Sequence, residues 1–173
     1  LSGYWTVSRV SAKYPHMTRF TMLYIRSNAN SDDGRVTPAT FPITSVAFNV
    51  GFASERHRDA GNAGPSIIMT CGNYEGGELL YWGDDDLARP VAQYDYQQCH
   101  RVSLKGIACL IDGNRAHEVT PFTGQRRSMV GFSYGKSWQI NAQVRQQLIE
   151  LGANPPTSIE DCASASWFCQ PFG

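Results

Sequence analysis

The sequence carries no net charge, no paired-cysteine motif and no long apolar run. Its 15 Lys+Arg balance 15 Asp+Glu, which excludes a globally basic protein of the histone kind but leaves room for a local basic patch. No apolar stretch approaches the ~20 residues that a membrane helix needs, so we expect no membrane partner. The five cysteines are odd in number and contain no CxxC pair, which excludes zinc-ribbon spacing.

The residues that are present suit one domain covering 1–173. Hydrophobic residues make up 42% of the chain, and Gly 16, Pro 9 and 12% aromatics favour a domain rich in strands and turns. We expect a core over about 46–134, followed by a helix and a tail over 137–173. Because the chain opens at Leu1 without a methionine, we expect it to be excised from a longer chain. Mostly reduced thiols are expected, with a Cys162–Cys169 disulfide as the alternative.

Short segments rich in strand-forming residues follow one another along most of the chain. After an early one at 19–25, they cover 45–52, 66–71, 77–82, 100–104, 108–111, 115–119 and 127–134. Clusters of Gly, Asn and Asp separate them. Many short strands with such punctuation predict a mainly β sandwich or barrel and not alternating strands and helices.

One amphipathic helix is predicted near 137–151, after the last strand. Ile140, Val144 and Leu148 recur at helical spacing, and Gly152 provides a stop signal. We expect this helix to pack outside the sheets. The acidic run 84–86 is expected to lie in a solvated loop.

A pair of metal-ligand candidates lies in the segment that follows the second strand candidate. In an extended backbone His57 and Asp59 project to the same face, ~7 Å apart. His117 follows on a separate predicted strand. Two imidazoles and one carboxylate form the facial triad of non-haem Fe(II) oxygenases, which leaves open positions on the metal. For any lone histidine the alternative is an ordinary surface or hydrogen-bonded core residue.

A cation for an anionic cosubstrate follows the second histidine. A 2-oxo acid chelated at such a metal extends a distal carboxylate, which the planar fork of an arginine can bind with two hydrogen bonds. Arg126 is the candidate, and Ser128 lies on the same strand face and can donate to the same carboxylate. Strand alternation then predicts that Arg127 points outward.

These motifs together resemble the Fe(II)/2-oxoglutarate-dependent dioxygenase superfamily. The order is H-x-D, then G-G-E-L, then D-G-x-x-x-H-x-V-x-P-F-x-G-x-R-x-S, over about half of the chain. The resemblance implies a double-stranded β-helix, or jelly roll, with flanking helices. It also implies that His57, Asp59 and His117 hold Fe(II), that Arg126 and Ser128 hold 2-oxoglutarate, and that O2 is consumed.

Within that superfamily, His57-Arg58-Asp59-x-x-Asn62 is similar to the motif of the TET/JBP group. The chain lacks the cysteine-rich region of the animal TET proteins, so it looks more like the compact members of protists, algae and fungi. The resemblance implies DNA as the partner, the methyl group of 5-methylcytosine or thymine as the substrate, and a nuclear location. It also implies that Asn62 contacts the target base.

Several alternatives stay open at this point. Asn62 can instead cap the turn after Asp59. Ascorbate replaces 2-oxoglutarate in one algal relative, and a prolyl-hydroxylase-like oxygenase acting on a peptide would share the same metal ligands. A jelly-roll binding module without turnover is the alternative from a different class.

Basic and aromatic side chains supply the other candidates for contacts with DNA. A basic rim is expected from Arg56, Arg58, Arg101, Lys105, Arg126 and Arg127. Stacking on a flipped base is conceivable for Tyr81 with Trp82, or for Tyr94 with Tyr96, although packing in the core is the favoured interpretation of these aromatics.

Overall fold

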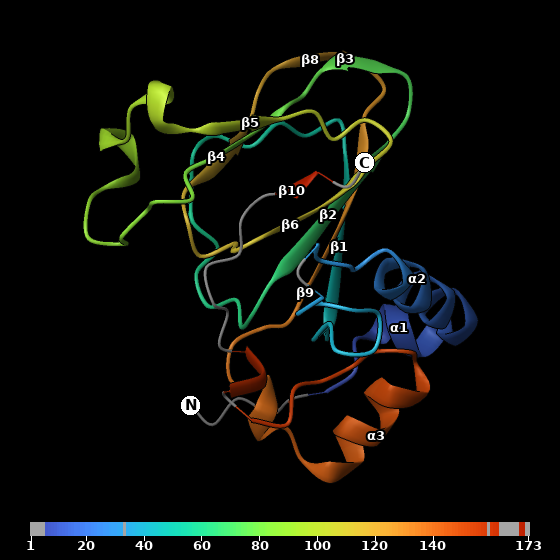
Figure 1. The fold of residues 1–173 in the computed structure, drawn as a ribbon. Helices are drawn as coiled ribbons and strands as arrows, with labels where there is room; N and C mark the ends of the chain where they lie inside the picture. Colours follow the sequence, from blue (N-terminus) through green and yellow to red (C-terminus); the bar gives the residue numbers. More distant parts are fainter. Residues whose placement is uncertain (1–5, 33, 159, 163–169, 172–173) are drawn as a thin grey trace.

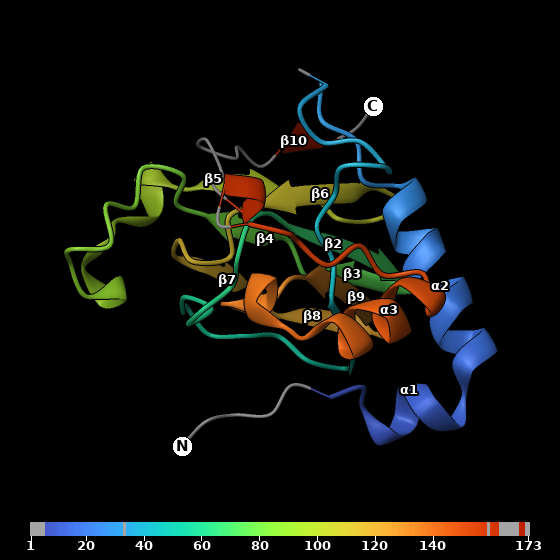
Figure 2. The ribbon, with the colours of Figure 1, turned by 90° about the horizontal axis from the view of Figure 1, so that it is seen from below.

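The computed structural model describes residues 6–32, 34–158, 160–162 and 170–171 (Figure 1). Three α-helices, α1 (Arg9–Lys13), α2 (Pro15–Ser27) and α3 (Ala142–Glu150), lie together on one side of the strands (Figures 1 and 2). Within these ranges the model contains no helix with the length and apolar character of a membrane span.

Antiparallel strands form the body of the molecule. The strands are β1 (Ser45–Val50), β2 (Ser66–Cys71), β3 (Tyr74–Gly76), β4 (Leu79–Tyr81), β5 (His100–Val102), β6 (Ala108–Ile111), β7 (His117–Val119), β8 (Phe122–Gly124), β9 (Arg127–Phe132) and β10 (Gln170–Pro171). They form a five-stranded sheet in the order β1-β9-β2-β6-β10, a three-stranded sheet in the order β5-β4-β7, and the pair β3-β8. Short 3-10 helices, η1 (Val91–Gln93), η2 (Tyr96–Gln98), η3 (Ser137–Gln139) and η4 (Glu160–Cys162), lie in the connections.

The strand pairing is nested, which defines the topology. Strand β1 pairs with β9, the segment at His57 bridges to β7, β2 pairs with β6, and β4 pairs with β5. An antiparallel ribbon folded over in this way is a jelly roll, in which β1, β2, β6 and β9 lie in the five-stranded sheet and β4, β5 and β7 lie in the three-stranded sheet. The predicted fold class, a mainly β double-stranded β-helix with flanking helices, is therefore confirmed.

A hydrophobic layer covers each of the two faces of the five-stranded sheet. Ile68 of β2 and Cys109 of β6 point between the sheets, where they pack against Leu79 and neighbouring residues. Ile67 of β2 and Leu110 of β6 point the other way, into the layer beneath the helices. Because both faces of these central strands are covered, their sequences are continuously apolar and do not alternate with polar residues.

The early segment 19–25 is helical, so the expectation of a strand there is wrong. It lies inside α2, which has Pro15 in its first turn, and Met22 and Ile25 are buried against the sheet one helical turn apart. A side chain at Gly131 of β9 would lie only 2.7 Å from Ile25, so a glycine is needed where the helix meets the sheet. Burial in this tertiary contact outweighs the strand propensity of the segment.

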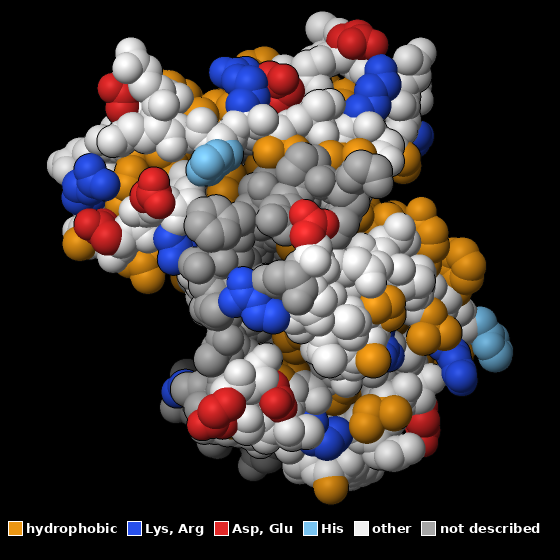
Figure 3. Space-filling view, viewed as in Figure 1, with side chains coloured by type: hydrophobic (Ala, Val, Ile, Leu, Met, Phe, Trp, Pro, Cys, Tyr) orange, Lys and Arg blue, Asp and Glu red, His pale blue; other side chains and the backbone are white. Residues whose placement is uncertain are grey.

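The outer surface of the two N-terminal helices remains apolar. Figure 3 shows hydrophobic side chains gathered over α1 and α2, and the exposed ones include Val10, Tyr14, Met17 and Phe20. These side chains lie on the helix side of the molecule, next to β1. Val10, Tyr14 and Met17 line a groove there together with Phe48 of β1.

The helix predicted near 137–151 is present but shorter. Asn141 caps α3 by accepting a hydrogen bond from the backbone N–H of Val144, and a separate 3-10 turn precedes it. Gly152, with φ of +82°, follows the end of the helix as the stop signal predicted. The proposed Cys162–Cys169 disulfide and the aromatic tail lie outside the described residues.

The sequence patterns did not predict two short strands and a lobe. Strands β3 and β8 fall in segments that resemble turns, because each is only three residues long and contains glycine. Residues 83–99 form a lobe, carrying η1 and η2, that extends away from the strands in both ribbon views (Figures 1 and 2).

Candidate metal centre

The two histidines of the predicted triad face each other across a pair of backbone hydrogen bonds. The N–H of His57 donates to the carbonyl of His117 and the N–H of His117 donates to the carbonyl of His57, each at 3.0 Å. This bridge adds the H-x-D segment to β7, beside the three-stranded sheet. Because directly opposed residues point to the same side of a β-ladder, the two rings meet, with centroids 4.3 Å apart.

Asp59 completes the cluster. Its backbone N–H donates to the carbonyl of Gly113 at 2.8 Å, which fixes the backbone two residues after His57. One candidate ligand atom from each of His57, Asp59 and His117 lies within 4.8 Å of the others. Asp59 Oδ1 lies 3.5 Å from His57 Nε2. Three side chains from two segments that are distant in the sequence therefore converge at one point.

Both imidazole rings are oriented through their Nδ1 atoms. Nδ1 of His57 lies 2.7 Å from the carbonyl oxygen of Glu55, and Nδ1 of His117 lies 2.8 Å from that of Arg115. With the carbonyl as acceptor, Nδ1 carries a proton in both rings, which leaves Nε2 as the atom that can bind a metal. In histidines that bind metals, a hydrogen bond from the ring nitrogen that does not bind the metal sets the tautomer and the orientation of the ring.

The charge states also suit ligation. Burial lowers the pKa of His117, so that its imidazole stays neutral. The hydrogen bond to Asp59 raises the pKa of His57. Burial opposes ionisation of Asp59, but the hydrogen bonds from His57 and Asn62 and the charge of a protonated His57 outweigh it and lower the pKa of this carboxyl. The cluster thus offers a carboxylate and a neutral imidazole, and a second imidazole whose proton a cation can displace.

The triad lies at the wall of a cavity of about 390 Å³ between the two larger sheets. Arg126, which directly precedes β9, projects into the same cavity and is only 3% exposed. Its Nε and Nη2 atoms have no hydrogen-bond partner among the described residues, and burial lowers the pKa of this guanidinium. Buried polar groups are normally hydrogen-bonded, so this arginine indicates an anionic ligand.

Ser128 and Arg127 lie where strand alternation predicts them. Ser128 is buried and lines the cavity two residues after Arg126, whereas Arg127 is exposed. The hydroxyl of Ser128 accepts a hydrogen bond from the Asn49 amide at 3.3 Å. Serine and arginine therefore converge on one end of the cavity.

Two exposed aromatic side chains line the cavity and were not singled out from the sequence. Phe52, in the loop after β1, is 57% exposed, and Tyr134, just beyond β9, is 50% exposed. They flank opposite ends of the paired strands β1 and β9. No sequence signal marks them, because an aromatic residue after a strand is as common in a core as on a surface.

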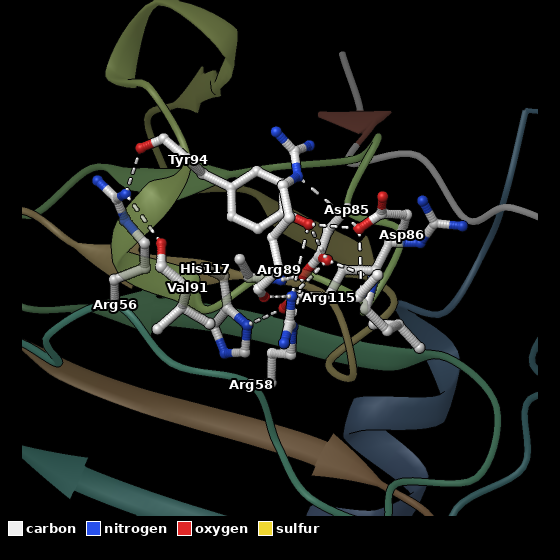
Figure 4. A network of polar contacts seen from close by, with 12 residues as sticks. Arg56, Arg58, Asp85, Asp86, Arg89, Val91, Tyr94, Arg115 and His117 are labelled. Atoms are coloured by element: carbon white, nitrogen blue, oxygen red, sulfur yellow. Dashed lines mark hydrogen bonds and ion pairs between the residues drawn. The ribbon is translucent and has the colours of Figure 1, made fainter.

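The expected basic rim does not include Arg56, Arg58 or Arg126. Arg126 is buried, and the other two alternate with the metal-ligand candidates along the H-x-D segment and point toward the 83–99 lobe (Figure 4). Arg56 is stacked between Trp82 and Tyr96, with its guanidinium carbon 3.9 and 4.3 Å from the two ring centroids. These arginines anchor the lobe to the metal-ligand segment.

The acidic run 84–86 is not wholly solvated, which corrects the expectation from sequence. Asp85 is 3% exposed and accepts two hydrogen bonds from Arg58, one from the Tyr94 hydroxyl and one from the backbone N–H of Ala116 (Figure 4). Burial opposes its ionisation, but Arg58, Tyr94 and backbone donors hold the pKa of this carboxyl far below the ordinary aspartate value. A run of like charges gives no sign that one member is buried.

The stacking candidates among the aromatics mostly belong to the core. Tyr81, Trp82 and Tyr94 are buried, in agreement with the favoured interpretation. Tyr96 is exposed at its outer face but packs against Arg56. The basic residues Arg101 and Lys105 are exposed and form ion pairs with glutamates.

The side chain of Asn62 contacts the candidate ligand Asp59. Its Nδ2 donates to Asp59 Oδ2 at 2.9 Å and to the hydroxyl of Ser66 at 3.2 Å. This contact agrees with the alternative that Asn62 stabilises the turn after Asp59, and it uses both amide hydrogens.

No protein-family model matches the chain, and no curated protein matches it. The solved structures that are similar to the chain over part of their length include the following two. A Pseudomonas putida prolyl-4-hydroxylase is 21% identical with a TM-score of 0.37, over 53% of this chain and 52% of its own. NgTET1, solved in complex with 5mC DNA, is 16% identical with a TM-score of 0.44, over 76% of this chain and 56% of its own. The chain thus spans little more than half of either protein.

Proposed function

We propose that the chain is a non-haem iron oxygenase that uses 2-oxoglutarate and O2 to hydroxylate a C–H bond. One observation carries this proposal: the convergence of His57, Asp59 and His117 beside a cavity that also receives the buried guanidinium of Arg126, whose Nε and Nη2 atoms have no hydrogen-bond partner among the described residues. Two imidazoles and one carboxylate suit Fe(II) and leave positions open for other ligands.

Each group has a distinct role in this proposal. The three side chains of the triad hold Fe(II), which supplies the redox chemistry that activates O2. Arg126 binds the distal carboxylate of 2-oxoglutarate through its free Nε and Nη2 atoms, and Ser128 lies on the same cavity face to assist. The enclosing sheets exclude water and orient the C–H bond of the substrate.

A binding module without turnover explains these features less well. Arg126 is 3% exposed, and leaving two of its buried nitrogens without an acceptor costs free energy in the folded state, unless an anion regularly occupies the cavity. A triad whose two imidazoles both direct Nε2 inward has no evident use in a module that only binds a macromolecule.

For the substrate we propose the methyl group of 5-methylcytosine or thymine in DNA, which favours a nuclear location. The H-R-D-x-x-N motif supports it, and so do the exposed rings of Phe52 and Tyr134 at the cavity, on which an extruded base can stack. A proline-containing peptide is the alternative substrate to be tested.

Anaerobic titration with Fe(II), with and without 2-oxoglutarate, tests the oxygenase proposal. A weak visible charge-transfer band that requires both components, and that His117→Ala abolishes, is the expected result. Iron binding without the band would indicate that the cosubstrate is not 2-oxoglutarate, and ascorbate would be tested first. A folded protein that binds no iron would overturn the proposal in favour of a binding module.

The substrate is tested separately by mass spectrometry of products. Methylated and unmethylated DNA oligonucleotides and a proline-containing peptide are incubated with Fe(II), 2-oxoglutarate and O2. We expect an oxygen atom to be added only to the methylated DNA. Hydroxylation of the peptide alone would exclude the DNA substrate and leave the oxygenase proposal intact.

A further inference from the structure

Both oxygen atoms of the Asp59 carboxylate have different surroundings. Oδ1 faces the Nε2 atom of His57 at 3.5 Å, whereas Oδ2 accepts the amide N–H of Asn62 at 2.9 Å. Asn62 is itself held in place, because its backbone carbonyl accepts the side-chain amide of Asn114 at 3.0 Å. The carboxylate therefore has a defined rotation about its side chain.

Gly113 packs against the same carboxylate from the turn between β6 and β7. A Cβ atom at this position would lie 2.7 Å from Asp59 Oδ2, 2.8 Å from Asn62 Nδ2 and 3.1 Å from the Ser66 hydroxyl. All three distances are shorter than ordinary van der Waals contact, so any side chain would displace the hydrogen-bonded group. The carbonyl of Gly113 also accepts the backbone N–H of Asp59.

We propose that Asn62 and Gly113 are positioning residues that orient Asp59 so that Oδ1 alone is presented to the metal. The inference rests on the proposed metal centre. Since Oδ2 is engaged by the Asn62 amide, Asp59 binds through a single oxygen, and the remaining positions stay open for the cosubstrate and O2. Gly113 supplies the space in which this hydrogen bond forms.

This role differs from the base contact that the motif resemblance implies for Asn62. The amide nitrogen has two hydrogens, and Asp59 and Ser66 accept both. No amide hydrogen is left to donate to a base edge. We therefore assign the amide nitrogen of Asn62 to the metal centre.

Titration with Co(II), whose visible spectrum reports the number of ligands, tests this assignment without turnover. Asn62→Leu removes the amide at nearly constant volume, and Gly113→Ala places a Cβ atom against the hydrogen-bonded pair of Asn62 and Asp59. We expect each to weaken Co(II) binding about 10- to 100-fold and to change the visible bands of the complex. The matched control is Asn49→Leu, which removes an amide that lines the same cavity but bonds to Ser128.

The metal-free variants are also unfolded thermally, so that loss of folding is distinguished from loss of positioning. Unchanged Co(II) affinity and spectrum in a folded Asn62→Leu would overturn the inference, and a selective loss of turnover on methylated DNA would then assign Asn62 to the base. If Co(II) binds wild type and His117→Ala equally, no metal centre exists and the proposed function falls together with this inference.

Discussion

The guanidinium of Arg58 forms a two-pronged ion pair with the buried carboxylate of Asp85, with Nε 2.7 Å from Oδ2 and Nη2 2.6 Å from Oδ1. The pair links the H-x-D segment to the 83–99 lobe. On one side of that segment the side chains of His57 and Asp59 point to the cavity, and on the other Arg58 ties the backbone to a distant loop. Arg58 thus fixes the backbone that carries the metal-ligand candidates, on the side away from the cavity.

Removing this carboxylate is expected to destabilise the fold. In Asp85→Ala the guanidinium of Arg58 and the N–H of Ala116 lose their acceptor in a buried setting. Breaking one partner of a buried pair costs about 3–5 kcal/mol of unfolding free energy. Urea denaturation measures this loss. Asp84→Ala, in the exposed neighbour, is the matched control and should change stability by less than about 0.5 kcal/mol.

Stability is expected to fall in acid partly because of Asp85. Its pKa is far below the ordinary value of 3.8, so the unfolded chain binds a proton more readily than the folded one. The stabilisation is complete well above pH 3.8 and is lost as the pH falls below that value toward the pKa of the folded state. Thermal melts from pH 7 downward should show a shallower acid dependence in Asp85→Asn. An identical slope in both proteins would contradict the assignment.

Loss of the cavity arginine is expected to affect the cosubstrate and not the fold. Arg126→Met keeps an unbranched side chain against Tyr74 and Phe122 but removes the unpaired charge. A charge-assisted hydrogen bond contributes about 1.5–3 kcal/mol, so 2-oxoglutarate should bind at least about 10-fold more weakly. Isothermal titration of the iron-loaded protein measures this. Arg127→Met, on the exposed face, should bind as wild type does, and equal losses would contradict the proposed orientation.

Binding of a metal should stabilise the protein measurably. A ligand that binds only the folded state, at 100 times its dissociation constant, adds about 2.7 kcal/mol. Melting curves with Mn(II) or Co(II) should therefore shift upward in wild type. In His117→Ala the shift should disappear, and a persistent shift would indicate that the cation binds elsewhere.

The lobe is expected to loosen when its arginine anchor is altered. Arg56 donates through Nη1 to the carbonyl oxygens of Val91 and Tyr94, and through Nε to Glu118 at 3.1 Å. Lysine keeps the charge but not the planar fork. Arg56→Lys should increase amide hydrogen exchange in the 83–99 lobe, while the central strand β2 stays protected. Unchanged exchange in the lobe would show that Arg56 does not anchor it.

Local patterns in the sequence determined most of the strands and the last helix. The apolar segments at 66–71 and 108–111 have the bounds of β2 and β6, because a run buried on both faces needs no information from the rest of the chain. Period-two alternation likewise separated the buried Arg126 and Ser128 from the exposed Arg127.

Tertiary structure alone decided the remaining features. The segment 19–25 is helical because the sheet offers a surface for Ile25, and Asp85 is buried because a distant Arg58 compensates its charge. The hydrogen bond between Asn62 and Asp59 needs the empty space at Gly113, which lies on another turn of the chain. Propensity and spacing describe neighbours along the sequence, whereas burial and charge compensation depend on residues that only folding brings together.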